Sequence, residues 1–377
     1  MSAADMGLRR PNFILDPRTD SDACFARDDV KPGDLVRTLQ IDLVTELAPK
    51  KIFWGPYGAG KTHTLYRTVH ELEKLTKVFP VHVECPNMER KSNFNDFYRD
   101  GIMSAMGSGL VVGLLEEYVE TKPPKKPDIQ LELIRDELHD ESLANAVLCL
   151  FNPKFPRLTF WSWISGFPLK ANDLRELGQT QDLTGAEPAY LATILVTIGE
   201  VLRRIRHLTL VLVLDELERL SELGAEGLNT MMTGFTRLAD QNQTSVAVLL
   251  GVSAKQLTNM PDIFAGNSPV MSRITSEGLI KIPPMEDSDV DSFIRRIIAF
   301  VRDPEFNIAD AVTAASQATP GETFTFDFFP FSDEALEAMK QSLSSENTPR
   351  EITYKMTRCL GRALLAKHTA ITQRSVE

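Results

Sequence analysis

A glycine-rich segment between an apolar run and a helical pattern limits the possible folds of this chain more than any other feature. It reads Gly55-Pro-Tyr-Gly-Ala-Gly-Lys-Thr62, which fits the pattern G-x-x-x-x-G-K-[ST]. The apolar run 52–54 predicts a buried strand before it, and residues 61–75 predict a helix after it. Gly58 and Gly60 can turn backbone N–H groups inward at the start of that helix, where phosphate oxygens bind. The sequence therefore predicts a phosphate-binding loop at the edge of a parallel sheet.

The residues that end this loop carry the predicted contacts with a nucleotide. The Lys61 ammonium can reach the β- and γ-phosphates, and the Thr62 hydroxyl can ligate Mg²⁺. The predicted nucleotide-binding set is the loop and the residue after it, namely Gly55, Pro56, Tyr57, Gly58, Ala59, Gly60, Lys61, Thr62 and His63. The histidines of the chain have no metal-ligand spacing, so no other metal centre is predicted.

A pair of acidic residues follows the most apolar run of the chain. Residues 208–214 are apolar without alternation, as in a strand that is buried on both faces of a parallel sheet. Asp215 and Glu216 come directly after them. A carboxylate at a strand end beside the phosphate-binding loop can hold Mg²⁺, and a second one can orient and deprotonate an attacking water. We assign the metal to Asp215 and the water to Glu216.

Three further polar residues are predicted to contact a nucleotide, two in their own subunit and one in a neighbouring subunit. Ser253 follows the apolar run 245–251 and can hydrogen-bond the attacking water or the γ-phosphate. Arg273 can project into the nucleotide of a neighbouring subunit, where such an arginine speeds phosphoryl transfer by about 10³- to 10⁵-fold. Arg350, at the start of a C-terminal helix, can reach back to the γ-phosphate. The alternatives are an ordinary loop serine, a surface arginine and a plain helix start with proline in its first turn.

Strand-like runs alternate with helical patterns up to Pro284. They lie at 52–54, 78–85, 208–214, 245–251 and 279–282, and they predict an α/β fold with a doubly wound parallel sheet. Residues 86–207 far exceed an ordinary crossover of about a dozen residues, so we expect a helical insertion at about 101–190. After Pro284 only helical patterns follow, which predicts an all-helical C-terminal lid.

The predicted domain organisation has three parts. Residues 1–34 form an N-terminal extension, and within it residues 1–30 are irregular and polar and are expected to wrap the domain surface. Residues 35–285 form the nucleotide-binding core with its insertion, and residues 286–377 form the lid. The Pro-Lys run at 122–127 is expected to be a solvated linker at which the insertion is hinged.

The composition of the chain limits which binding partners and which cellular compartment are expected. The formal net charge of −11 argues against a surface that attracts nucleic acid as a whole. No apolar run is long enough to span a bilayer and no signal peptide is found, so no membrane association is expected. Trp161 and Trp163 are expected to be core residues rather than a base-stacking platform. The cysteines show no CxxC pair, which argues against zinc and disulfides and favours the cytoplasm; they are Cys24, Cys85, Cys149 and Cys359.

The ordered set of motifs resembles the AAA+ P-loop ATPases. The stretch from Ser272-Arg273 through Ile282-Pro-Pro284, followed by a helical lid with Arg350, is most similar to the origin-recognition and initiator branch. This resemblance implies an AAA+ core that binds ATP with Mg²⁺, water attack on the γ-phosphate, and a site that is completed between subunits. By it, Arg273 matches the arginine that acts on a neighbouring subunit, and Arg350 matches the lid arginine that senses the nucleotide.

Two other similarities bear on the biological role. Residues 160–166, followed by 174–178, are similar to ATP-binding proteins of bacterial phage-exclusion (BREX-type) operons. Initiators usually continue into a winged-helix DNA-binding domain, whereas this chain stops soon after its lid, at Glu377. Contact with nucleic acid is therefore expected through the interior of a ring, through the inserted helices or through a partner.

Two functions of different classes follow from these patterns. The first is an ATP hydrolase that assembles into a ring or filament and hydrolyses ATP between protomers. It would remodel or load onto DNA or a partner protein, in prokaryotic genome defence or mobile-element handling. The second is a slow ATP-dependent switch that recruits a partner effector protein. A kinase or other phosphotransferase is disfavoured, because the sequence has the lid and the intersubunit arginine but no evident acceptor site.

Overall fold

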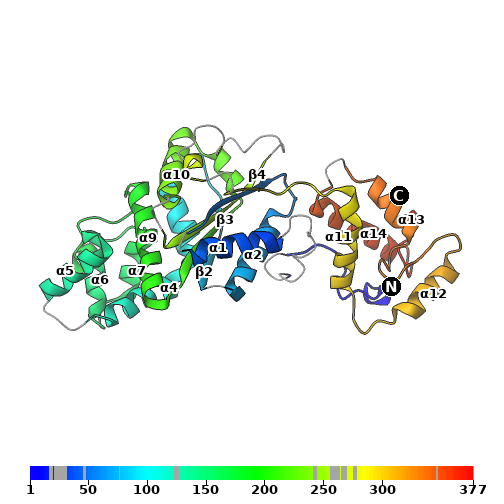
Figure 1. The fold of residues 1–377 in the computed structure, drawn as a ribbon, viewed down its shortest axis with the longest axis horizontal. Coiled ribbons are helices and arrows are strands. Elements are labelled where there is room, and N and C mark those ends of the chain that lie inside the picture. Colours follow the sequence, from blue (N-terminus) through cyan, green and yellow to red (C-terminus); the bar gives the residue numbers. More distant parts are fainter. Residues whose placement is uncertain are drawn as a thin grey trace.

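The computed structural model describes residues 1–16, 20, 32–45, 48–75, 77–122, 127–240, 244–254, 264, 270–274, 278–344 and 347–376. Its centre is a five-stranded parallel sheet with the order β2-β3-β4-β1-β5 (Figure 1). The strands are β1 (Lys50–Gly55), β2 (Val78–Glu84), β3 (Thr209–Asp215), β4 (Val246–Ser253) and β5 (Leu279–Lys281). The predicted fold class, a parallel α/β sheet with a helical insertion and C-terminal helices, is confirmed.

The strand register brings the functional strand ends to one edge of the sheet. Gly55 at the end of β1 pairs with Ser253 at the end of β4, and Glu84 at the end of β2 pairs with Asp215 at the end of β3. Because β4 lies between β1 and β3, the phosphate-binding loop and the acidic pair are one strand apart.

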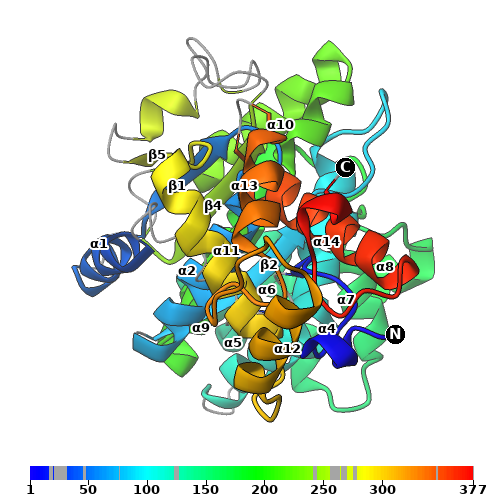
Figure 2. The same cartoon turned by 90° about the vertical axis from the view of Figure 1, so that its right-hand side faces the viewer.

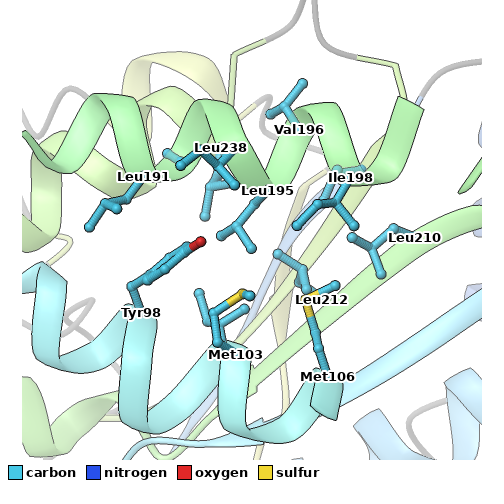
Figure 3. Close-up of a cluster of buried hydrophobic side chains, with 14 of the residues drawn as sticks. Tyr98, Met103, Met106, Leu191, Leu195, Val196, Ile198, Leu210, Leu212 and Leu238 are labelled. Carbon is cyan, nitrogen blue, oxygen red and sulfur yellow. The ribbon is translucent and has the colours of Figure 1, made fainter. Parts of the chain in front are cut away.

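Each face of the sheet has its own hydrophobic core. In β3, Val211 and Val213 face α1 (Pro32–Val44) and α2 (Lys61–Leu75). Leu210, Leu212 and Leu214 face the other core, which α4 (Ser104–Glu120), α9 (Pro188–Arg206) and α10 (Ala225–Leu238) share (Figure 3). The unbroken apolar run of β3 therefore reflects burial on both faces, as predicted.

The helical insertion begins soon after β2 and returns to the sheet with α9. It contains α3 (Phe94–Asp96), a π-helical turn (Phe97–Met103), α4, α5 (Pro127–Leu138), α6 (Glu141–Leu148), α7 (Arg157–Ile164) and α8 (Ala171–Glu176). Trp163 is fully buried in its core and Trp161 is half-buried against that core, so the predicted core role is confirmed in full for Trp163 and in part for Trp161. The expected hinge at residues 123–126 lies outside the described residues, as does Cys24.

One helical segment of the insertion is longer and more apolar than the sequence analysis allowed. Helical residues extend from Phe94 to Glu120 across a kink at Gly107, whose φ of 74° and ψ of 152° are not helical, and by length and composition alone the segment could cross a membrane. Half of the most apolar window of this segment is buried. Tyr98, Met103 and Met106 face α9 and β3 in the core (Figure 3), so the segment is a core helix of the insertion.

The C-terminal helices form a separate hydrophobic core together with the N-terminus. The helices are α11 (Asp287–Val301), α12 (Ile308–Ala318), α13 (Asp333–Gln341) and α14 (Pro349–Leu365). Their core contains Met6, Leu8 and Phe13 from the start of the chain. Figures 1 and 2 both place the N-terminus among these helices.

The expectation that residues 1–30 wrap the surface is wrong for their described part. The Arg9 N–H donates to the Val301 carbonyl at 2.9 Å, and the Asp303 N–H donates to the Gly7 carbonyl at 2.8 Å. The Phe13 N–H donates to Thr357 Oγ1 at 3.0 Å. The segment is mostly polar, and its few buried apolar side chains follow neither a helical nor a strand period. They lie on an irregular backbone, so the sequence pattern did not indicate their burial.

Replacing Phe13 with alanine should destabilise the C-terminal helices. Its ring is fully buried and packs against the Phe331 ring at 5.7 Å between centroids. A buried Phe→Ala change costs about 3–5 kcal/mol. Denaturant unfolding followed by circular dichroism should show this loss for Phe13→Ala. Ile14→Ala, at a side chain that is 53% exposed, is the matched control and should stay near wild-type stability. Equal stability of both variants would contradict the shared core.

Candidate nucleotide-binding site

A pocket of about 580 Å³ opens at the edge of the sheet where the strands end. Its walls come from the phosphate-binding loop and α2, from the ends of β2, β3 and β4, from helices α11 and α14, and from residues 14–16 of the N-terminal segment. Its volume is in the range of pockets that enclose a small ligand. The predicted residues Tyr57, Gly58, Gly60, Lys61, Thr62, His63, Asp215, Glu216, Ser253 and Arg350 all line it.

The glycine-rich loop has the backbone that the sequence predicted. Gly58 and Gly60 have φ values of 81° and 93°, a left-handed conformation that favours glycine. Helix α2 begins at Lys61, so its free backbone N–H groups face the loop. The Lys61 ammonium is buried and donates to the carbonyls of Gly55 and Pro56, at 3.2 and 2.9 Å. Burial lowers the pKa of Lys61, and the negative charges of Glu218 and Asp215 oppose this decrease.

Asp215 and Thr62 meet at the floor of the pocket. The Asp215 side chain is 7% exposed, and it hydrogen-bonds with Thr62. Burial raises the pKa of Asp215, while the bonds from Thr62 and from the Glu216 N–H oppose that rise. A hydroxyl beside a carboxylate is a donor set that suits Mg²⁺, which prefers oxygen ligands, and a cation here would stabilise the buried charge.

Gly251 on β4 makes room for this carboxylate. A Cβ atom at position 251 would lie 2.3 Å from Asp215 Oδ1 and 2.7 Å from Leu65 Cδ1. Both distances are far below van der Waals contact. Gly251 is thus required for Asp215 to reach Thr62, although nothing in the sequence pattern of an apolar strand indicates this role.

Glu216 occupies a special backbone position and is ion-paired. Its φ of 58° and ψ of 33° are left-handed, which directs the chain into the 3-10 helix η5 (Leu217–Glu222). The Glu216 carboxylate contacts the Arg219 guanidinium, which also donates to the Cys85 carbonyl at 2.5 Å and pairs with Glu84 at 3.2 Å. Burial raises the pKa of Glu216, and Arg219 opposes the rise. The predicted base is therefore held toward the end of β2.

Glu218 is a pocket residue that the sequence analysis did not assign to the site. Its carboxylate accepts from Ser253 on both oxygens, at 2.7 Å from Ser253 Oγ and 3.0 Å from the Ser253 N–H. The hydroxyl proton of Ser253 is thus committed to Glu218 in this structure. Glu218 comes two residues after Glu216, in the turn that directly follows the end of β3. This position in the sequence is the signal that could have indicated the contact.

The lid arginine lies against the phosphate-binding loop. The Arg350 guanidinium is 4.6 Å from the centroid of the Tyr57 ring, which is itself 66% exposed. The Arg350 N–H approaches the Gly58 carbonyl at 3.4 Å. A Cβ atom at Gly58 would lie 2.9 Å from Arg350 Cβ, so glycine is needed for this close approach. Arg350 therefore lies within side-chain reach of a nucleotide on the loop.

Arg273 is placed away from this pocket. It lies in the short 3-10 helix Met271–Arg273, and its guanidinium donates to Ser272 Oγ at 3.4 Å. It is not among the described residues that line the pocket. The structure thus brings together the loop, Asp215, Glu216, Ser253 and Arg350, but not Arg273.

Comparison with known proteins gives structural likeness only. No protein-family model and no curated protein matches the sequence. The ORC2 protein of Aeropyrum pernix, solved in ADPNP–ADP complexes, has a TM-score of 0.48 at 13% identity, over 92% of this chain and 65% of that chain. Cdc6p from Pyrobaculum aerophilum has a TM-score of 0.43 at 13% identity, over 90% and 63%. Drosophila ORC bound to DNA has a TM-score of 0.45 at 11% identity, over 92% and 58%.

The chain spans less than two thirds of the length of these three structures. They are AAA+ ATPases of the origin-recognition and Cdc6 type, the group that the motif order resembles.

Gly251→Ala should weaken binding of a magnesium nucleotide, because the added methyl group displaces the Asp215 carboxylate. The measurement is the rise in melting temperature on adding Mg²⁺ and ATP, which should shrink from wild type to the variant. Gly109→Ala is the control, since a Cβ atom there meets nothing within 4 Å in helix α4. Replacing a helical glycine gains about 0.5–1 kcal/mol, so the control should be slightly more stable and bind normally. Normal binding by Gly251→Ala would refute the packing argument.

Asp215→Asn should make the ligand-free protein more stable at neutral pH. The raised pKa means that folding disfavours the charged carboxylate, so a penalty is present above the folded pKa and is relieved as pH falls through it. Asparagine keeps an acceptor oxygen without the charge. We expect a melting temperature roughly 2–4 °C higher, about 1 kcal/mol, at pH 7.5, and a smaller difference from wild type in acid. A variant that is less stable than wild type at neutral pH would contradict this account.

Proposed function

We propose that this chain is an AAA+ ATP hydrolase that binds ATP with Mg²⁺ in the pocket between the sheet edge and the lid. The observation that carries the proposal is the convergence of Lys61, Thr62, Asp215 and Glu216 at one strand edge, with Arg350 reaching the same pocket from α14. The likeness in fold agrees with this assignment but adds no residue roles.

In this proposal each group has a separate task. Backbone N–H groups of the loop and the Lys61 ammonium bind the β- and γ-phosphates, which replace the two carbonyls that Lys61 now contacts. Thr62 and Asp215 hold Mg²⁺, and the bound ion would neutralise phosphate charge. Glu216 orients the attacking water and takes its proton. Glu218 positions the end of β4 through Ser253.

We further propose that the site is completed by a second copy of the chain. Arg273 lies outside the pocket of its own protomer, which suits a residue that serves the nucleotide of a neighbour. A ring or filament would place one such arginine at every site. The work of such an assembly would be to remodel or load onto DNA or a partner protein, with nucleic acid reached through the ring interior or the partner.

Two sequence features support the proposed biological setting. The similarity of residues 160–166 to phage-exclusion proteins favours genome defence or mobile-element handling. Free thiols at the described cysteines, Cys85, Cys149 and Cys359, favour the cytoplasm.

A slow switch that recruits an effector protein is the second candidate, and one observation favours it. The Glu216 carboxylate is ion-paired with Arg219, which is itself anchored on the end of β2. A carboxylate held in that pair is turned toward Arg219 and is not free to orient a water molecule. If the pair persists when ATP is bound, turnover is slow and the bound state is long-lived.

ATP hydrolysis per subunit should rise with protein concentration and fall about 10³-fold in Arg273→Ala. Arg175→Ala, at an exposed arginine of α8 in the insertion, is the matched control and should hydrolyse ATP normally. Lys61→Ala should lose nucleotide binding and therefore hydrolysis, whereas Glu216→Gln should bind ATP without hydrolysing it.

Phosphate release, measured across a series of protein concentrations, reports the hydrolysis rate of all four variants. If the hydrolysis rate per subunit changes neither with protein concentration nor in Arg273→Ala, the site shared between subunits is excluded and the slow switch becomes the favoured function.

A further inference from the structure

One carboxylate of the nucleotide pocket already accepts hydrogen bonds from donors that suit a phosphate. Glu218 lines the pocket. Its Oε1 accepts from Ser253 Oγ at 2.7 Å, and its Oε2 accepts from the Ser253 N–H at 3.0 Å. Both carboxylate oxygens are thus held by one residue at the end of β4. A backbone N–H beside a hydroxyl can bind the oxygens of other anions, and phosphate oxygens accept hydrogen bonds as carboxylate oxygens do.

The same carboxylate lies near the lysine of the phosphate-binding loop. The negative charge of Glu218 acts on the buried Lys61 ammonium more strongly than that of Asp215 does. In the strand register, Ser253 pairs with Gly55, the first residue of the loop. Glu218, Ser253 and Lys61 therefore surround one region of the pocket, between the loop and the end of β4.

This region is where the third phosphate of ATP would bind. A lysine in this position of a phosphate-binding loop contacts the β- and γ-phosphates. In the proposed function the γ-phosphate therefore lies beside Lys61, next to the donors of Ser253. Glu218 and the γ-phosphate are both negative, so they repel each other at short range and compete for the same donors. ADP has no group in this region and leaves the contacts between Glu218 and Ser253 in place.

We propose that Glu218 discriminates between the two nucleotides by opposing the γ-phosphate, so that ATP binds only as Glu218 releases Ser253. This inference rests on the proposed function, because it takes the phosphates to lie on the loop. Glu218 is a specificity-determining residue in it. ADP binds to the arrangement seen in this structure, whereas ATP must also break the hydrogen bonds from Ser253 and bring a further negative charge beside a carboxylate.

The test is equilibrium binding of ADP and of the slowly hydrolysed analogue ATPγS to the full chain, each with Mg²⁺. Wild type should bind ADP at least as tightly as ATPγS. Glu218→Gln should bind ATPγS about tenfold more tightly than wild type, since it removes one short-range charge repulsion, and should bind ADP unchanged. Glutamine fits the same space, and its amide can contact Ser253 through both an oxygen and a nitrogen.

Glu222→Gln is the matched control. Glu222 is an exposed residue of the same 3-10 helix, η5, and it is not among the described residues that line the pocket. The substitution removes the same charge outside the pocket, so this variant should keep both wild-type affinities.

The outcomes separate this inference from the function on which it rests. If Glu218→Gln changes both affinities by the same factor, changes neither, or weakens ATPγS binding, Glu218 has only a structural role and the inference is overturned. Wild type that binds ATPγS more than about tenfold tighter than ADP also overturns it, and that comparison needs no variant to fold. If wild type binds neither nucleotide, or Lys61→Ala binds both as wild type does, the proposed function itself fails.

Discussion

The buried carboxylate of Asp215 is the group on which the rest of this site depends. It is held beneath the phosphate-binding loop by Thr62 and by the absence of a side chain at Gly251. The parallel register of β1, β4 and β3 makes this meeting possible, because it aligns strand ends from distant parts of the sequence. A carboxylate charge kept at 7% exposure is unfavourable, and a bound cation would stabilise it. The ligand-free site is therefore destabilised in the same place where a magnesium nucleotide would be bound.

The lid is connected to this site by two separate contacts. Arg350 and Thr348 approach Gly58 from the start of α14. The N-terminal segment leaves the hydrophobic core of the C-terminal helices at Phe13 and reaches the first turn of α2 at Leu15. A nucleotide bound between them would touch both. The C-terminal helices therefore contact the pocket both at the glycine-rich loop and near the first turn of α2, and in the proposed function a bound nucleotide would respond to their position.

The elements of the core could be predicted from the sequence because local pattern and burial coincide there. The loop, Asp215 and helix 61–75 follow a short pattern that one backbone geometry satisfies. The role of residues 3–13 could not be predicted, since an irregular segment buries Met6, Leu8 and Phe13 without any period. The bounds of helix α12 could not be predicted for a similar reason: only Ala315 of its residues is buried, so its apolar stripe is weak. Glu218 and Gly251 act through contacts between strands that only the register creates.

The arrangement of the acidic pair bears on which of the two candidate functions the chain performs. Asp215 and Glu216 are adjacent, yet their environments differ: Asp215 is buried against Thr62, whereas Glu216 turns left-handed toward Arg219 and the end of β2. In the proposed function, Asp215 is the member of this pair that takes part in binding the magnesium nucleotide. The proposed turnover would also require Glu216 to exchange its guanidinium partner for a water molecule, and the anchoring of Arg219 on Cys85 and Glu84 opposes that exchange. The two functions thus share one pocket and differ in the free energy of a single ion pair, which a neighbouring subunit at this edge of the sheet could change.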